Sequence, residues 1–296
     1  MGGRSSTRHP GRPRRRSGRS RILVVDDDRS TREMMRVQLE SAGYAVDTES
    51  DGARALARLR RKPCHLVLLD VWMPGMGGLE VLAELDGVPS RPKVVVMTAD
   101  DAPETLLRAL RERACRYMTK PVEPQRLLSI VRQLLEADCD PRPIEVVSAK
   151  PTWVELLVPC DLQSADRIQD VLARLDADLP EEVRADVGHA FHELLMNAIE
   201  WGGALDPEQM VRIAYLRADR MLLYRIADPG RGFSFEGLNH SALKNPQGQP
   251  LEHARVRQEK GLRPGGFGLL LAQTIVDELL YNEAQNEVVF VKYLDR

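Results

Sequence analysis

A chain of 296 residues with 43% hydrophobic and 29% charged content has enough apolar material for the cores of two ordinary domains. No apolar run approaches the roughly 18 residues that span a membrane, and four scattered cysteines argue against a zinc site or a disulfide framework, so we expect a cytoplasmic protein. The formal charge of −2 is uneven, because residues 1–20 carry seven arginines and no acid, which leaves 35 basic against 44 acidic residues in the rest. An acidic body is a poor match for nucleic acid, and we expect the basic tail to be disordered.

From Arg21 onward, apolar runs alternate with helical stretches. Strands are predicted at 21–28, 45–48, 65–70, 92–98 and 116–119, and the intervening segments show helical spacing, the last helix spanning about 123–136. Five strand–helix units of this length predict an α/β domain with a doubly wound, five-stranded parallel sheet and helices on both faces.

Polar side chains follow the strands of this predicted sheet. Asp26 and Asp27 end the first strand, Asp70 the third and Thr98 the fourth, and Lys120 follows the fifth. The carboxyl ends of parallel strands meet at one edge, where such sheets bind their ligands. Three converging carboxylates raise one another's pKa unless a cation neutralises them, and oxygen ligands of this kind suit Mg²⁺.

These residues resemble the response-regulator receiver domain of two-component systems, across about 21–138. The resemblance implies that Asp70 accepts a phosphoryl group from the phosphohistidine of a cognate sensor histidine kinase. It also implies a metal site formed with Asp26, Asp27 and the backbone carbonyl of Trp72. By the same resemblance, Thr98 and Lys120 contact the phosphoryl oxygens, Tyr117 is the aromatic residue that swings inward with the threonine, and Pro121 is a cis-proline.

The second half has a different pattern. Residues 139–151, with several prolines, are interpreted as a linker. After it we predict strands at 153–159, 210–217, 220–228 and 287–294, and helices at 163–175, from Pro180 to Trp201, and from about Gly266 to Leu280. Residues 233–264 are polar, rich in Gly and Pro and without periodicity. A loop of this length in a compact domain is usually functional or disordered. The order predicts an α+β sandwich.

Glu193 and Asn197 lie four residues apart and therefore on one stripe of the predicted helix. Periodicity alone does not separate a solvated face from an active one. Glycine motifs favour the active face: Gly230 and Gly232 follow Asp228 at the end of a strand, and three more glycines open a helix at Gly265, Gly266 and Gly268. Glycine lets backbone approach a ligand closely, and a helix N-terminus binds phosphate, although either motif alone also fits a turn or a helix cap.

This combination resembles the ATP-binding domain of the GHKL superfamily, in its anti-sigma-factor serine kinase branch, across about 152–296. The resemblance implies that Asn197 coordinates the Mg²⁺ on the ATP phosphates and that Asp228 accepts a hydrogen bond from the adenine amino group. Gly230 and Gly232 would line the base pocket, with 233–264 as the ATP lid. The phosphates would lie against Gly265, Gly266, Gly268 and Arg263, and Glu193 would be the base that takes a proton from a substrate serine. The lid is long for this branch, and Trp201 replaces a common histidine.

Several functions are compatible with this pair of domains. The first is a response regulator that controls a serine/threonine kinase acting on an anti-anti-sigma or sigma-factor-like partner, and the second is an ATP-gated protein-binding switch without phosphotransfer. The segment between the domains is too short for the helical hairpin of a hybrid histidine kinase, and no helix-turn-helix segment is left for a DNA-binding domain. The sequence does not indicate whether phosphorylation of Asp70 activates or inhibits the output, or whether the protein forms a homodimer.

Overall fold

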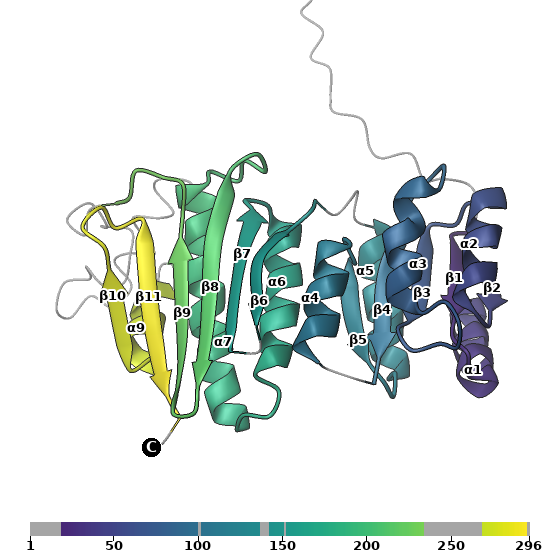
Figure 1. The fold of residues 1–296 in the computed structure, drawn as a ribbon, viewed down its shortest axis with the longest axis horizontal. Helices are drawn as coiled ribbons and strands as arrows, with labels where there is room; N and C mark the ends of the chain where they lie inside the picture. Colours follow the sequence, from purple (N-terminus) through teal and green to yellow (C-terminus); the bar gives the residue numbers. More distant parts are fainter. Residues whose placement is uncertain (1–18, 100–101, 137–141, 151, 234–267, 295–296) are drawn as a thin grey trace, which may run out of the picture.

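The computed structural model describes residues 19–99, 102–136, 142–150, 152–233 and 268–294, and Figure 1 shows two sheets side by side, each with its own helices. The basic tail up to residue 18 and the predicted lid from residue 234 onward lie outside the described residues. Within the described ranges, no helix has the length and apolar character needed to cross a lipid bilayer.

The N-terminal domain contains the predicted five-stranded parallel sheet, and its strands lie in the order β2-β1-β3-β4-β5. Its strands are β1 (Arg21–Val25), β2 (Ala45–Glu49), β3 (Leu66–Asp70), β4 (Lys93–Thr98) and β5 (Arg116–Thr119). Its helices are α1 (Arg29–Ser41), α2 (Gly52–Arg61), α3 (Gly78–Glu84) with a 3₁₀ turn η1 (Leu85–Gly87), α4 (Pro103–Arg111) and α5 (Pro124–Glu136).

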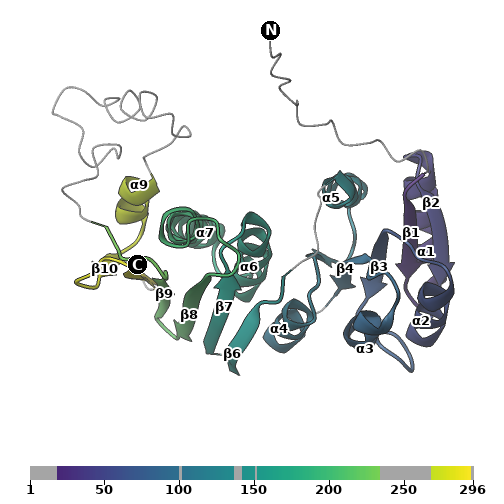
Figure 2. The same cartoon turned by 90° about the horizontal axis from the view of Figure 1, so that it is seen from above.

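Helices cover both faces of this sheet. Apolar residues of α1 and α5 form a core on one face, and those of α2, α3 and α4 form a core on the other (Figure 2). Asp28 and Asp51 start α1 and α2 by accepting hydrogen bonds from backbone N–H groups three residues on, at 2.7 and 2.9 Å. Because β3 is buried along its whole length, its last residue, Asp70, is held firmly at the carboxyl edge.

The C-terminal domain contains a six-stranded antiparallel sheet in the order β10-β11-β9-β8-β7-β6, covered on one face by helices (Figure 2). Its strands are β6 (Glu145–Lys150), β7 (Trp153–Pro159), β8 (Met210–Ala218), β9 (Met221–Ala227), β10 (Glu278–Tyr281) and β11 (Glu287–Tyr293). Its helices are α6 (Leu162–Leu175), α7 (Glu181–Asn197), which continues as a π-helical turn η2 (Ala198–Gly202), and α9 (Gly268–Ile275). This layered α+β arrangement agrees with the predicted fold class.

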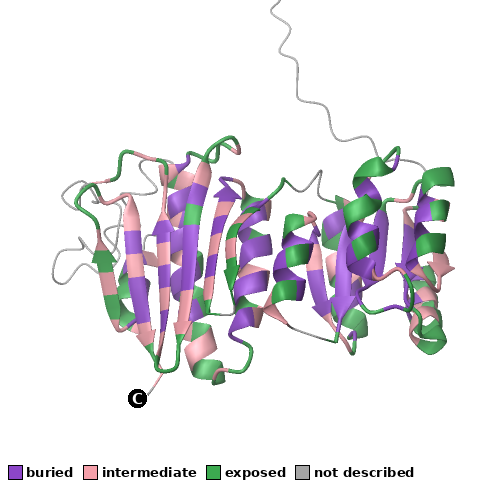
Figure 3. Ribbon diagram, in the orientation of Figure 1, coloured by how far each residue is buried: buried purple, intermediate pink, exposed green. Residues whose placement is uncertain are grey.

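An aromatic cluster joins α7 to the second sheet. Tyr224 stacks on Phe290 with ring centroids 4.8 Å apart, and Phe191 and Tyr215 lie 5.4 and 5.0 Å from the same ring. Along the strands, buried residues alternate with partly exposed ones, the pattern of a sheet packed on one face (Figure 3). The cluster therefore fixes where α7 lies on the sheet.

Two predicted elements are wrong in part. The segment 139–151, interpreted as a linker, contains the strand β6, whose residues are mostly exposed because it is the outermost strand. The helix predicted to run from Gly266 to Leu280 ends at Ile275, and the residues from Glu278 to Tyr281 form β10. Two consecutive leucines in β10 suit a helix and an edge strand equally, so periodicity did not separate them.

The two domains are in contact through α6. The buried guanidinium of Arg167 donates hydrogen bonds to the carbonyls of Ala114, Leu110 and Arg142, at 2.9, 3.0 and 2.5 Å. Two of these carbonyls lie at or just beyond the C-terminal end of α4 in the first domain. Arg174, two turns further along α6, donates to the hydroxyl of Thr119 and to the carbonyl of Tyr117. Helix α6 therefore contacts both α4 and β5.

Candidate functional sites

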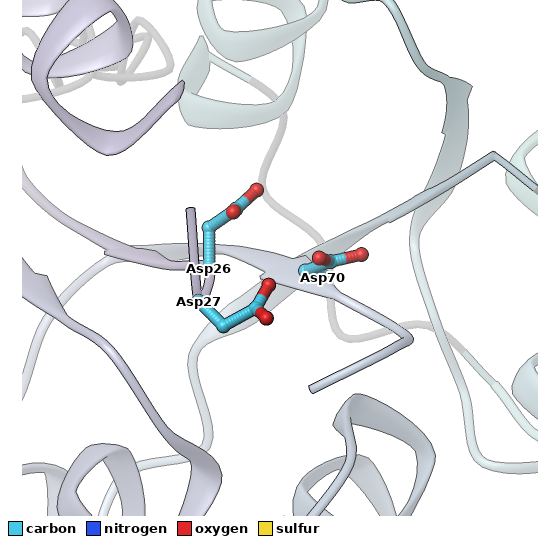
Figure 4. A group of neighbouring side chains, drawn as sticks. All are labelled: Asp26, Asp27 and Asp70. Carbon is cyan, nitrogen blue, oxygen red and sulfur yellow. The ribbon is translucent and has the colours of Figure 1, made fainter. Parts of the chain in front are cut away.

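Three aspartates meet at the carboxyl edge of the first sheet. Carboxylate oxygens of Asp26, Asp27 and Asp70 all lie within 4.8 Å of one another (Figure 4). Asp26 and Asp70 are buried, whereas Asp27 is exposed and opens the group to solvent. The predicted convergence of these side chains is what the structure shows.

Lys120 lies against this group. Its Nζ is 2.6 Å from Asp70 Oδ2 and 2.8 Å from Asp26 Oδ2. Burial raises the pKa of Asp70, and the Asp26 charge adds to the rise while Lys120 opposes it. Burial alone would lower the pKa of Lys120, but the two carboxylates outweigh it and raise that pKa. One ammonium thus pairs with two of the three carboxylates.

The aspartate group fits a divalent cation. Asp26 Oδ2 is a buried oxygen that accepts no hydrogen bond in good geometry, although the Lys120 ammonium forms an ion pair with it. A second cation would neutralise the remaining negative charge, and carboxylate oxygens are the ligands that Mg²⁺ prefers. Trp72, whose carbonyl is the further predicted ligand, lies two residues beyond Asp70 and donates its N–H to Asp70 Oδ1 at 3.4 Å.

The remaining residues predicted for this pocket lie on its neighbouring strands. Thr98 is fully buried at the end of β4, and its carbonyl accepts a hydrogen bond of 2.9 Å from the Lys120 N–H. Tyr117 on β5 points inward, and its hydroxyl donates to the carbonyl of Leu106 in α4 at 2.5 Å. The peptide bond between Lys120 and Pro121 is cis, as predicted.

A second candidate site lies at one end of α7. Asp228 follows β9, and its Oδ1 accepts a hydrogen bond of 2.8 Å from the N–H of Gly230. Burial raises the pKa of Asp228. A Cβ on Gly202, at the end of η2, would lie 2.3 Å from Asp228 Oδ1, so only glycine lets α7 end this close to the carboxylate.

The polar stripe of α7 faces α9 rather than open solvent at Glu193. A Cβ added to Gly268, the first residue of α9, would lie 1.9 Å from Glu193 Oε2, so this carboxylate touches the first turn of α9. Asn197, one turn further along α7, is partly buried. Gly265, Gly266 and Arg263, which were predicted to join this site, lie outside the described residues.

Sequence reasoning missed two residues of this second site. Gly202 contacts Asp228 across 26 positions, and the pair of glycines after Trp201 was the available signal. Asn286, in the turn between β10 and β11, donates from Nδ2 to the carbonyl of Gly230 at 3.0 Å. An asparagine in a hairpin turn has many ordinary explanations, so the sequence carried no signal for it.

Comparisons with known proteins agree with this geometry. The family model described as "Response regulator receiver domain" matches residues 22–132, and the one described as "Histidine kinase-like ATPase domain" matches residues 158–292. The chain is 36% identical over 164 residues to "DNA-binding response regulator MtrA" of Mycolicibacterium paratuberculosis, covering 54% of this chain and 70% of that protein. The chain belongs to the response regulator family.

Other relatives match a shorter part of this response regulator. "Response regulator MprA" of Mycobacterium leprae is 38% identical over 115 residues, 39% of this chain and 50% of that protein. A solved CheY-like receiver domain protein from Methanospirillum hungatei JF-1 is 29% identical, covers 40% of this chain and 95% of its own, and aligns with a TM-score of 0.39. The two family-model matches give this response regulator a phosphorylatable receiver domain and, after it, an ATPase-like domain.

Proposed function

We propose that phosphorylation of Asp70 by a sensor histidine kinase controls an ATP-binding output domain that acts as an anti-sigma-type serine/threonine kinase on a partner protein. In this proposal the receiver spans about 21–138 and the output domain about 152–296. The partner would be an anti-anti-sigma or sigma-factor-like protein. ATP and Mg²⁺ are the cofactors, and the receiver metal is also Mg²⁺.

The observation that carries the kinase proposal is the position of Glu193. Its carboxylate lies against the first turn of α9, and Asn197 follows one helical turn away on the same stripe. A helix N-terminus suits phosphate oxygens. Bound Mg-ATP would supply the phosphoryl group. Asn197 would hold the metal, and Glu193 would accept the proton of a serine or threonine hydroxyl at its carboxylate.

Asp228 supports ATP as the nucleotide. It is a partly buried carboxylate in a loop of closely packed glycines, and it can accept a hydrogen bond from the adenine amino group. Guanine presents a carbonyl at the corresponding position, which would leave the carboxylate unpaired. We therefore expect ATP to bind at least about tenfold more tightly than GTP.

Control of the output by Asp70 is supported by the contacts of α6. On one side of α6, Arg167 and Arg174 donate hydrogen bonds to atoms of the receiver. On its other side, Gln169 contacts the ring of His192 on α7. His192 is the neighbour of Glu193 in the chain. A shift of α4 or β5 that follows phosphorylation would therefore reach α7 through a single helix.

The experiment that tests the kinase proposal compares Glu193→Gln with Asn197→Ala. With labelled ATP, Mg²⁺ and purified partner proteins from neighbouring genes, wild type should transfer phosphate to serine or threonine. Glu193→Gln should bind ATP like wild type but transfer phosphate about 10²–10⁴-fold more slowly, because a base acts in the transition state. Asn197→Ala should weaken Mg-ATP binding itself.

The alternative function, an ATP-gated binding switch, gives a different result in the same experiment. ATP would bind and change partner affinity, Asn197→Ala would weaken ATP, and Glu193→Gln would have no effect because no phosphate is transferred. Acetyl phosphate with Mg²⁺ tests the receiver separately. Intact mass should show one phosphoryl group on wild type and none on Asp70→Asn, and labelling that persists in the variant would mean that the acceptor is another residue.

A further inference from the structure

The turn between β10 and β11 lies against the loop that carries Asp228. The backbone N–H of Asp228 donates to the carbonyl of Asn286 at 2.9 Å, and the side-chain Nδ2 of Asn286 donates to the carbonyl of Gly230 at 3.0 Å. Further along the same loop, a Cβ on Gly232 would lie 1.6 Å from the carbonyl oxygen of Ala284. The turn therefore holds the loop at three successive points.

Hydrogen bonds within the turn fix the orientation of the Asn286 amide. Asn282 Nδ2 donates to Asn286 Oδ1 at 2.8 Å, and Asn282 Oδ1 accepts from the N–H groups of Asn286 and Glu287 at 3.1 and 3.2 Å. Because the Oδ1 of Asn286 already accepts a hydrogen bond, its Nδ2 is the end that faces Gly230. Asn282 and Asn286 together form what we call the asparagine clamp, in which Asn282 holds Asn286 in place and Asn286 contacts the loop.

The clamp acts on the residue proposed to recognise the base. Asp228 Oδ1 accepts from the N–H of Gly230, so the position of Gly230 sets the rotamer of the Asp228 carboxylate. Gly230 is held on its carbonyl side by Asn286 and on its N–H side by Asp228. Without Asn286, the glycine loop would have more conformations available and the carboxylate would be less well placed.

We propose that Asn286 is a positioning residue that makes the output domain selective for adenine, by holding Gly230 and through it the Asp228 carboxylate. This inference rests on the proposed ATP-binding function and assigns a source for its base specificity. Asn286 itself need not touch the nucleotide. Its effect should therefore be larger on the choice between ATP and GTP than on the affinity for the shared triphosphate.

The test measures the affinities of ATP and GTP, with Mg²⁺, by calorimetric titration of the full chain. The variants are Asn286→Ala, which removes the side-chain amide, and Asn286→Asp, which keeps the shape but lacks the donor to Gly230. Glu283→Gln, an exposed change in the same turn, is the matched control. We expect both Asn286 variants to lower the ratio of ATP to GTP affinity about tenfold, the effect of one well-placed hydrogen bond, and the control to match wild type.

The outcomes are distinct. A ratio within twofold of wild type in both Asn286 variants would overturn the inference while leaving ATP binding intact. An equal loss of ATP and GTP affinity, with a lower melting temperature, would show a merely structural turn and would also overturn it. Wild type that binds neither nucleotide would instead refute the proposed function on which the inference rests.

Discussion

At the scale of single residues, the lack of a side chain at Gly202 lets the Asp228 carboxylate lie against the end of η2. A Cβ at residue 202 would lie 2.2 Å from Asp228 Cγ, far inside van der Waals contact. We expect Gly202→Ala to displace the carboxylate and to weaken ATP binding at least about tenfold, the loss of a well-placed hydrogen bond. Calorimetric titration measures the change.

Gly188 provides the matched control for that substitution. It lies exposed within α7, and apart from its chain neighbours and the backbone of α7 itself, no atom of the described residues lies within 4 Å of the position of an added Cβ. Gly188→Ala should leave ATP affinity unchanged and stabilise the protein by about 0.5–1 kcal/mol, because glycine is unfavourable inside a helix. Equal ATP affinity in the two alanine variants would argue against close packing of η2 on Asp228.

Asp176 is a buried carboxylate whose titration should affect stability. It accepts hydrogen bonds from the hydroxyls of Tyr215 and Tyr224, at 2.7 and 2.6 Å, yet burial still raises its pKa. A pKa raised in the folded state means that the protonated form favours folding. The contribution of Asp176 is therefore full below about pH 4, its unfolded pKa, and is lost as the pH rises through the folded value.

Urea unfolding of wild type and Asp176→Asn from pH 4 to 7 isolates this effect. Relative to the variant, which does not titrate at this position, wild type should lose stability as the pH rises. All other acids are common to both proteins and cancel in the difference. Parallel pH profiles would mean that the pKa of Asp176 is the same in the folded and unfolded states.

The positions of Asp70 and Asp228 in the fold were predictable because each lies at the end of a strand next to a recognisable turn or motif. Asn286 was not, because its contact with Gly230 joins positions 56 apart and depends on how two loops pack. Local sequence patterns predict a helix or strand and where it ends. They do not predict which two turns come into contact in the folded chain.

At the scale of elements, the stability of α7 on its sheet depends on Phe191. This side chain is 3% exposed, and its ring lies 5.4 Å from that of Tyr224. Phe191→Ala should cost about 3–5 kcal/mol of folding free energy, through lost burial and the cavity left behind. ATP affinity should also fall, since Asn197, the proposed holder of the metal on ATP, lies on the same helix.

His189→Ala, an exposed change on the same helix, is the control and should stay within about 0.5 kcal/mol of wild type. Urea denaturation gives both values. A Phe191→Ala cost below about 1 kcal/mol would show that α7 is held mainly by other contacts.

Most elements followed from apolar periodicity, and those that did not were edge elements. The parallel strands β3 and β4 are buried runs and stand out in the sequence. Strands β6 and β10 lie at the two edges of the second sheet, and all of their residues are exposed or only partly buried. An edge strand forms backbone hydrogen bonds with one neighbouring strand instead of two, so its sequence shows a weaker apolar pattern.

At the scale of the whole molecule, Arg167 connects the domains. It is 2% exposed, and its guanidinium donates to three carbonyls, two of them from the α4 end of the receiver. We expect beryllium fluoride with Mg²⁺, a phosphoryl mimic at Asp70, to change the ATP affinity of wild type at least threefold. In Arg167→Met, which keeps the length but not the donors, this change should be abolished.

Arg174→Gln gives a second, less buried test of the same link, and Arg212→Gln, an arginine paired with Glu155 on the second sheet, is the control. Calorimetric titration with and without beryllium fluoride measures the change. A full response in both α6 variants would mean that the signal does not pass through these arginines. The sequence could not predict the link, because an arginine on an amphipathic helix normally lies in solvent.

The position of β6 has a consequence for how the chain can be divided. Strand β6 pairs with β7 and α4 of the receiver contacts β6, so the outer edge of β7 is covered in the intact protein (Figure 1). A fragment that begins at residue 152 would leave the backbone N–H and C=O groups of β7 open beside apolar residues such as Val154 and Leu156. Exposed edges of this kind recruit strands from other molecules, so we expect that fragment to aggregate where one beginning at residue 142 stays monodisperse. Strand β6 thus also guards the second sheet against intermolecular extension.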